Sequence, residues 1–219
     1  DGTMLNAANQ LGPADIPVAG INVGTLGFLT TCTDNELDIF AKAVAQKDYT
    51  LIKRMQLRAT ITSANGEQMS FRALNEVTLA RGQTGRLVEL DAWVDGELLN
   101  HYRADGLIVA TTTGSTAYSL SAGGPLIAPK AEVFVITPIC PHSLSNRSLV
   151  VSHSSLVELA PAENAECPMF LTVDGRDVMA INQGDRIQVE QAGHALPLLR
   201  LEGRNFYSTL RQKLGWGRD

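Results

Sequence analysis

The feature that most constrains the fold is a change of hydrophobic period near residue 50. Before Tyr49, apolar residues recur every three or four positions, which is typical of helices that bury one face. Beyond it, apolar and polar residues alternate over 57–62 and 88–94, which is typical of half-buried strands. A chain that changes period in this way is expected to fold as an α/β lobe followed by a β-rich domain.

The segment 1–50 is predicted to be a partial Rossmann-like α/β lobe. A helix over 3–11 is expected to end at Gly12-Pro13, and the apolar run 16–21 is expected to form a buried strand. A second helix is expected after Thr33, because Glu36 follows three residues later and can complete a capping box. Its apolar side comprises Leu37, Phe40, Ala43 and Val44.

Residues 51–200 are predicted to form a β-sandwich-like domain, because many short strands occur at close spacing. Asn65-Gly66 and Asp95-Gly96 supply tight-turn signals after the first two alternating runs. The segment 201–219 is expected to form a helix that ends at Gly215 and returns to the first lobe. Further strands are expected at 107–110, 133–136, 149–151, 156–159, 170–173, 187–189 and 196–201.

Charge and cysteine usage exclude several classes of function. The 219 residues carry 18 Lys and Arg against 23 Asp and Glu, a net charge of −5. Nucleic-acid binding is disfavoured, because neutralising phosphates requires a basic surface. No apolar run reaches the ~18 residues of a membrane span, so no membrane partner is expected. The widely spaced Cys32, Cys140 and Cys167 suit free thiols, which predicts a cytoplasmic location.

The chain opens with Asp1-Gly2-Thr3 directly before the first predicted helix. A Gly-containing turn at a helix start can hold phosphate through its unpaired N–H groups. The same tripeptide is also a common turn and N-cap, and on its own the pattern favours that simpler interpretation. A start this abrupt predicts that the sequence is N-terminally incomplete.

Asn75 and Glu76 form a second polar stretch. Adjacent residues of a strand point to opposite faces, so the pattern alone favours a solvated start of a strand. A functional interpretation requires that they stand at the end of the strand, where the turning backbone lets both reach one ligand.

The third stretch, 111–125, gives the strongest signal. It follows the apolar run 107–110 and is dense in Thr, Ser and Gly. Buried hydroxyls need partners, so this composition disfavours a core and favours a pocket that receives a polar ligand. It is not a Walker loop, because no Gly-Lys-Ser/Thr follows.

These motifs together resemble the ATP-NAD kinases of bacteria over essentially the whole chain. Asp1-Gly2-Thr3 is similar to the end of the family's Gly-Gly-Asp-Gly-Thr motif, and Gly20–Leu29 to its second landmark. Leu74–Val77 is similar to its Asn-Glu motif. Asp105-Gly106 with Thr113–Tyr118 is similar to its most specific signature, which lipid kinases and phosphofructokinases of the same superfamily lack.

The resemblance implies a reaction and a catalytic residue. The family transfers the γ-phosphoryl of ATP to the 2′-hydroxyl of the adenosine ribose of NAD, with Mg²⁺ or another divalent cation accompanying ATP. Asp1 would be the proton acceptor, Gly2 would face phosphates, and no metal ligand is assigned on the chain. Asn75 and Glu76 would bind ribose hydroxyls. The family also implies a homodimer or homotetramer whose sites lie near subunit interfaces.

The resemblance assigns the other dinucleotide contacts residue by residue. Arg86 and Arg103 would face the pyrophosphate, Asp105 and Ala117 would read polar edges, and Tyr118 would pack on a ring. The remaining positions of the set are Thr113, Thr116, Ser119, Leu120, Ser121, Cys140 and Arg176. Two positions depart from the family's pattern: Thr112 stands where Pro is usual, and Arg176 where Gln is common.

Two functional classes stay open at the level of sequence. The favoured one is the NAD kinase, a phosphotransferase acting on an alcohol group. The alternative is a catalytically incomplete NAD(P)-binding module of the same family. A lipid kinase of the superfamily is disfavoured by the acidic composition and by the lack of a basic or amphipathic patch.

Overall fold

The computed structural model describes residues 1–24, 27–82, 85–163 and 165–217. The chain divides into two compact units: Asp1–Arg54 with His194–Asp219, and Met55–Gly193. Both ends of the chain therefore belong to the first unit, and the division lies a few residues inside the expected 51–200. Among the described residues, none of the helices has the length and apolarity that crossing a bilayer demands.

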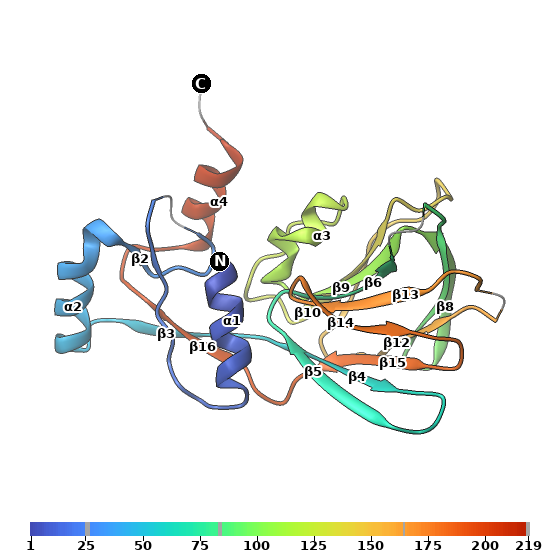
Figure 1. Cartoon of the computed structure of the whole chain (residues 1–219). Helices are drawn as coiled ribbons and strands as arrows, with labels where there is room; N and C mark the ends of the chain where they lie inside the picture. The colour runs from blue at the N-terminus through green and yellow to red at the C-terminus, as the bar shows by residue number, and fades with distance from the viewer. Residues whose placement is uncertain (25–26, 83–84, 164, 218–219) are drawn as a thin grey trace. The chain divides into compact units, whose positions relative to one another are not determined.

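The first unit combines helices with two small sheets (Figure 1). Parallel pairing joins β1 to β2, and antiparallel pairing joins β3 to β16. The mixture agrees with the expected α/β lobe. Its elements are α1 (Gly2–Leu11), β1 (Ile21–Asn22), β2 (Cys32–Thr33), the 3₁₀ turn η1 (Asp34–Glu36), α2 (Leu37–Gln46), β3 (Thr50–Arg54), β16 (Leu196–Arg200) and α4 (Phe206–Leu214).

The helix signals of this unit are present, although the helices begin a few residues away from the predicted positions. The helix α1 ends before Gly12, whose φ is 58°. The Thr33–Glu36 capping box is present, with the Thr33 N–H donating to Glu36 Oε2 at 2.8 Å, although it opens η1 rather than α2 itself. On α2, Phe40 and Ala43 pack beside Cys32 in a small core.

Two expectations for this unit are wrong in detail. The buried strand expected at 16–21 does not form as one run: Val18 makes a single bridge with Leu198, and of these residues Ile21 alone belongs to a strand, β1. Pro17 has no N–H to donate, and Ile16 is half exposed. The expected apolar side of α2 is only partly buried, since Leu37 and Val44 are exposed. Of the Gly20–Leu29 landmark, Thr25 and Leu26 lie outside the described residues.

The C-terminal segment returns to the first unit, as expected. Asn205 caps α4 by accepting the Ser208 N–H at 2.9 Å, and Gly215 ends the helix in the left-handed conformation. The Phe206 ring lies 5.9 Å from that of Phe28.

The second unit is a sandwich of two six-stranded sheets in the order β11-β10-β9-β6-β13-β14 and β5-β4-β15-β12-β7-β8 (Figure 1). Neighbouring strands run antiparallel. The strands are β4 (Leu57–Thr62), β5 (Gln68–Ala73), β6 (Glu76–Arg81), β7 (Val88–Val94), β8 (Glu97–Ala104), β9 (Gly106–Ala110), β10 (Val133–Ile139), β11 (Leu149–Ser152), β12 (Val157–Pro161), β13 (Met169–Val173), β14 (Arg176–Ile181) and β15 (Arg186–Gln191).

The core lies between the two sheets. Alternate residues of β4, such as Leu57 and Ile61, meet residues of β6 and β10, such as Leu79 and Phe134, and all four are fully buried. This packing confirms the expected β-sandwich, because only one face of each strand can enter a core between two sheets.

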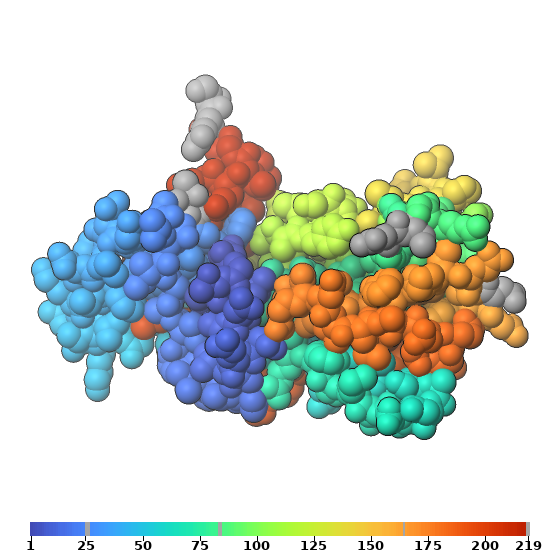
Figure 2. Space-filling model, in the orientation of Figure 1, coloured from blue at the N-terminus to red at the C-terminus, as the bar shows by residue number. Residues whose placement is uncertain are grey.

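The first sheet is also covered on its outer face. The segment 111–131 contains the 3₁₀ turn η2 (Gly114–Thr116) and the short helix α3 (Tyr118–Ser121). Its Ile127 packs on Ile108 and Val135 from the sheet. Figure 2 shows the segment, in yellow-green, as part of the surface of this unit. Its position brings the hydroxyl-rich stretch to one end of the first sheet.

Candidate functional site

The Asp1 carboxylate is directed to a loop rather than to its own helix. It makes no capping hydrogen bond to α1 within the described residues. Instead, it accepts the backbone N–H groups of Leu29 at 3.2 Å and Phe28 at 3.4 Å. Gly27 makes this approach possible, since a Cβ there would lie 2.4 Å from Asp1 Oδ1. Gly2 faces open space, so a ligand could approach the first turn of α1.

Asn75 and Glu76 stand where β6 begins, and the structure buries both. Their exposed fractions are 8% and 7%, so the simpler interpretation of a solvated start of a strand is wrong. Their backbone is held by Asp174, in the turn between β13 and β14. Its carboxylate accepts the backbone N–H groups of Leu74 at 2.8 Å, Asn75 at 2.7 Å and Glu76 at 3.2 Å.

Two buried carboxyl groups therefore meet at this end of the sheet. Burial, and secondly the charge of Asp174, raise the pKa of Glu76 to about 7. Burial also raises the pKa of Asp174, although the three backbone N–H groups and the Arg176 charge oppose the rise. Near neutral pH, Glu76 can thus exist in either protonation state, which is unusual for a glutamate.

The hydroxyl-rich turn approaches the same strand end. Thr111 donates through Oγ1 to the Leu74 carbonyl at 2.6 Å, and its N–H donates to the Asn75 carbonyl at 2.8 Å. Gly114 is needed for this contact, because a Cβ there would lie 2.1 Å from the Asn75 carbonyl oxygen. Residues 74–76 and η2 are therefore locked together.

Several hydroxyls of the turn are buried with structural partners, although the composition was expected to disfavour a core. Ser115 Oγ lies 2.8 Å from the Thr112 carbonyl and accepts the Ile127 N–H at 3.1 Å, and Ser119 Oγ is 3.0 Å from Thr137 Oγ1. Buried hydroxyls are stable where partners exist. Ser119, one of the predicted ligand contacts, is thus fully buried against the sheet.

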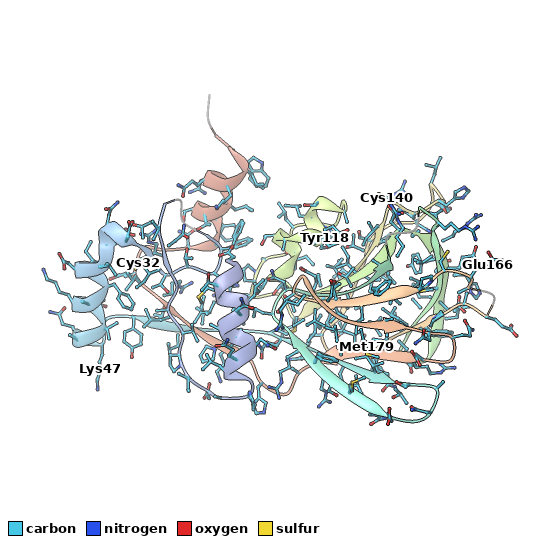
Figure 3. The ribbon with its side chains drawn as sticks, viewed as in Figure 1. Cys32, Lys47, Tyr118, Cys140, Glu166 and Met179 are labelled. Atoms are coloured by element: carbon cyan, nitrogen blue, oxygen red, sulfur yellow. The ribbon has the colours of Figure 1, made fainter. Side chains whose placement is uncertain are left out.

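Three buried polar atoms in this region lack a hydrogen-bond partner among the described residues: Glu76 Oε2, Thr113 Oγ1 and Arg176 Nε. A buried unpaired polar atom costs about 1–3 kcal/mol, so such atoms mark places where a ligand or water completes the bonding. Tyr118, labelled in Figure 3, follows Thr113 by five residues on α3 and is 46% exposed. Of the other predicted contacts here, Thr116, Ala117 and Leu120 are half-buried and Ser121 is exposed.

The remaining predicted contacts lie at the other end of the strands. Asp105 pairs with Arg81 at 2.6 Å. Arg81 is the last residue of β6 and follows Glu76 by five positions, so at ~3.4 Å per residue it lies about 17 Å from Glu76. Cys140 follows β10 at this same end, exposed and with φ 43°. The structure therefore divides the predicted site residues of this unit into two groups.

The two predicted pyrophosphate arginines share a surface hollow of about 800 Å³. Arg103 pairs with Glu89 at 3.5 Å, and Arg86 with Glu166 at 3.3 Å, all largely exposed. Exposed pairs of this kind contribute little to stability and leave the guanidinium groups available to an anion. Glu166 lies at the edge of the unit remote from Tyr118 (Figure 3).

Sequence reasoning misses the structural role of Asp174. The pair Asp174-Gly175 signals a turn, but nothing local indicates that its carboxylate serves a strand about 100 residues earlier. Taken together, the buried carboxyls, the unpaired polar atoms and the covering turn define a β-sandwich protein with a polar candidate site at the end of one sheet.

Comparisons with known proteins identify the family. Residues 1–49 match the ATP-NAD kinase N-terminal domain, and residues 74–201 match the ATP-NAD kinase C-terminal domain. The chain belongs to the ATP-NAD kinase family, a family of phosphotransferases.

Individual relatives agree. The chain is 41% identical to the NAD kinase of Natranaerobius thermophilus over 219 residues, all of this chain and 76% of that protein. It is also 41% identical to the NAD kinase of Geobacter sulfurreducens, over 99% of this chain and 76% of that protein.

Two solved structures share the fold. Yeast NADH kinase complexed with NADH has a TM-score of 0.92 and 31% identity. It covers all of this chain, which spans 64% of the yeast chain, just under two thirds. An NAD kinase from Archaeoglobus fulgidus in complex with ATP has a TM-score of 0.77 and 28% identity over 96% of this chain and 80% of that one.

Proposed function

We propose that this chain is the principal part of an NAD kinase that converts NAD and ATP into NADP and ADP. The 2′-oxygen of the adenosine ribose attacks the γ-phosphorus, its proton passes to Asp1, and the bond from the γ-phosphorus to the bridging oxygen breaks to release ADP. The observation that carries the proposal is the Asp1 carboxylate, which two loop N–H groups orient while it leaves its own helix uncapped.

Asp1 suits the role of proton acceptor for a simple reason. Its two hydrogen bonds to the loop are long, 3.2 and 3.4 Å, so its oxygens retain lone pairs for a substrate hydroxyl. The start of α1, at Gly2, would favour the negative phosphates through the helix dipole. Phosphoryl transfer depends on such positioning and charge neutralisation more than on covalent chemistry.

The end of the first sheet would hold the dinucleotide. Asn75 and Glu76 would bind ribose hydroxyls, and the unpaired Glu76 Oε2 and Thr113 Oγ1 are suited to that purpose. The exposed ring of Tyr118 would pack on a base or nicotinamide ring. Thr116, Ala117, Leu120, Ser121 and Arg176 complete the contacts proposed at this end of the sheet, whereas Ser119 is fully buried and bonded to Thr137.

We propose a homo-oligomer, a dimer or tetramer, and the separation of the two groups of residues supports it. Asp105 and Cys140 lie at the opposite end of the strands from Glu76, and Arg86 and Arg103 border a separate hollow. We propose that this second group contacts a dinucleotide bound by another subunit. A guanidinium pair is well suited to pyrophosphate charge.

Magnesium is proposed to enter with ATP. In the described part of the chain, no three His, Cys, Asp or Glu side chains stand together as a ligand set for a metal. The cation would therefore be held chiefly by the phosphates of the substrate, as is usual for Mg²⁺. A cytoplasmic location is proposed from the three free cysteines, none of which is in a disulfide.

The test is Asp1→Asn in the full-length protein, with Asp38→Asn, an exposed acid in the first turn of α2, as the matched control. The asparagine keeps a carbonyl acceptor for the loop but cannot take a proton at neutral pH. Turnover is expected to fall by about 10²–10⁴ while the Kd for NAD changes by less than about threefold.

Undiminished turnover of the Asp1→Asn protein would remove Asp1 from the mechanism. A wild-type protein that binds NAD but transfers no phosphoryl group from ATP would instead support the catalytically incomplete NAD(P)-binding module.

A further inference from the structure

We propose that Asp174 is a positioning residue: its carboxylate fixes the backbone of residues 74–76 and thereby aims Asn75 and Glu76 at the dinucleotide. The inference rests on the proposed function, because it concerns how the same site is held in shape. Asp174 itself need not touch the substrate.

The geometry shows a closed set of hydrogen bonds. Asp174 Oδ1 accepts the N–H groups of Asn75 at 2.7 Å and Glu76 at 3.2 Å, and Oδ2 accepts that of Leu74 at 2.8 Å. In return, the Asp174 N–H donates to the Glu76 carbonyl at 3.0 Å. Charge-assisted bonds to backbone N–H groups are about twice as strong as neutral ones, so three of them hold a strand end firmly.

The turn that carries Asp174 is built for this task. Asp174 has φ 49°, in the left-handed region that Asp and Asn tolerate better than other side-chain-bearing residues, and Gly175 has φ 72°. The ladder between β13 and β14 shifts register between Leu171 and Thr172, just before this turn. The conformation carries its carboxylate away from the hairpin and onto the neighbouring strand β6.

Asp185 provides an internal comparison in the same unit. It is also buried, and its carboxylate accepts the N–H groups of Ala64 at 3.0 Å and Asn182 at 2.8 Å. It thus joins two turns in the way that Asp174 joins a turn to a strand, but no predicted ligand contact adjoins the residues it holds. Replacing Asp185 therefore measures the stability lost with a buried carboxylate that binds backbone N–H groups but positions no ligand contact.

Asp174 also sets the electrostatic surroundings of Glu76. Its charge is the one that raises the Glu76 pKa in addition to burial. Arg176, on β14, acts on Asp174 in turn. Among the other elements around Glu76, the strand β9 and the segment up to Ser121 contribute Tyr118 as their one ionisable group. The strand β6 ends in Arg81, whose charge is paired with Asp105. Replacing Asp174 by a neutral residue should therefore move the ionisation of Glu76 to lower pH.

The experiment compares Asp174→Asn and Asp174→Gly with Asp185→Asn in the full-length protein. Asparagine retains one carbonyl oxygen, and glycine tolerates the positive φ, so both should fold. We expect the KM for NAD to rise about tenfold in Asp174→Asn and further in Asp174→Gly, with kcat within about threefold of wild type. The Kd for NAD, measured between pH 5 and 9, should report the ionisation of Glu76. In both Asp174 variants, we expect this ionisation to occur at lower pH than in the wild type.

Asp185→Asn should lower the Tm and leave both the KM for NAD and that pH profile unchanged. The inference is overturned if Asp174→Asn and Asp174→Gly keep the wild-type KM and profile, or if Asp185→Asn raises the KM equally. These outcomes require an active wild-type protein, so they are distinguishable from failure of the proposed function, in which the wild type itself would not phosphorylate NAD.

Discussion

Replacing Glu76 by Gln should remove a pH dependence from the stability of this protein. Glu76 is 7% exposed, and its pKa rises from an ordinary 4.5 to about 7 on folding. The folded state therefore binds the proton more tightly than the unfolded state does. Ionised Glu76 destabilises the folded state, and this cost is absent below pH 4.5, grows as the pH rises, and is complete above pH 7.

The magnitude follows from the two pKa values. Each pKa unit corresponds to ~1.4 kcal/mol, so the complete cost is about 3 kcal/mol, of which about 2.5 kcal/mol develops between pH 5 and pH 8. The Glu76→Gln variant has no such cost, because an amide does not ionise. Its free energy of unfolding, measured relative to wild type, should thus increase by about 2.5 kcal/mol from pH 5 to pH 8.

Urea unfolding at the two pH values measures this difference. A Trp216→Phe background leaves Trp93, on β7, as the fluorescent reporter of the β-rich unit, because the chain has two tryptophans. Glu97→Gln, exposed at the start of β8, is the control for the loss of one charge. If the difference between Glu76→Gln and wild type is the same at pH 5 and pH 8, the burial and charge argument for Glu76 is refuted.

Two further predictions concern stability. Gly114→Ala should lower the free energy of unfolding in urea by at least about 2 kcal/mol, because the new Cβ would meet the Asn75 carbonyl. Gly193→Ala is the control: a Cβ there has no neighbouring atom within 4 Å, so the free energy of unfolding should be nearly unchanged. Asn205→Ala should lower the stability of the first unit by about 1 kcal/mol through loss of the cap on Ser208, which fraying of α4 in amide hydrogen exchange would reveal; unchanged exchange would contradict it.

The interior strands of the sandwich could be predicted from sequence, and most of its edges could not. The strands β4 and β7 match the predicted 57–62 and 88–94 because one face of each is buried and the other is not. By contrast, β5, β8 and β14 are edge strands with largely exposed or mixed faces, so their residues do not alternate.

The candidate site was predictable in its motifs but not in its chemistry. The run 113–121 and the pair Asn75-Glu76 do meet at one end of a sheet, as a shared ligand requires. The hydrogen bonds that hold this pair could not be predicted, because they come from Asp174, which lies about 100 residues further along the chain. The alternation of apolar and polar residues shows only which side chains of one strand share a face. The Asp174 carboxylate reaches residues 74–76 because β13 pairs with β6.

The division of the predicted contacts into two groups was equally invisible in the sequence. Asp105 precedes the signature run by only a few residues, yet the antiparallel strand β9 carries the chain from one end of the sheet to the other between them. Proximity in sequence therefore suggested a single site, and the length of one strand separates the two groups.

The most direct measurement is the crystal structure of the full-length protein with NAD bound. We predict that an Asp1 carboxylate oxygen lies within about 3.2 Å of the 2′-oxygen of the adenosine ribose, with the dinucleotide touching Asn75 or Glu76. A 2′-oxygen held beyond reach of that carboxylate, in every subunit of the assembly, would contradict it.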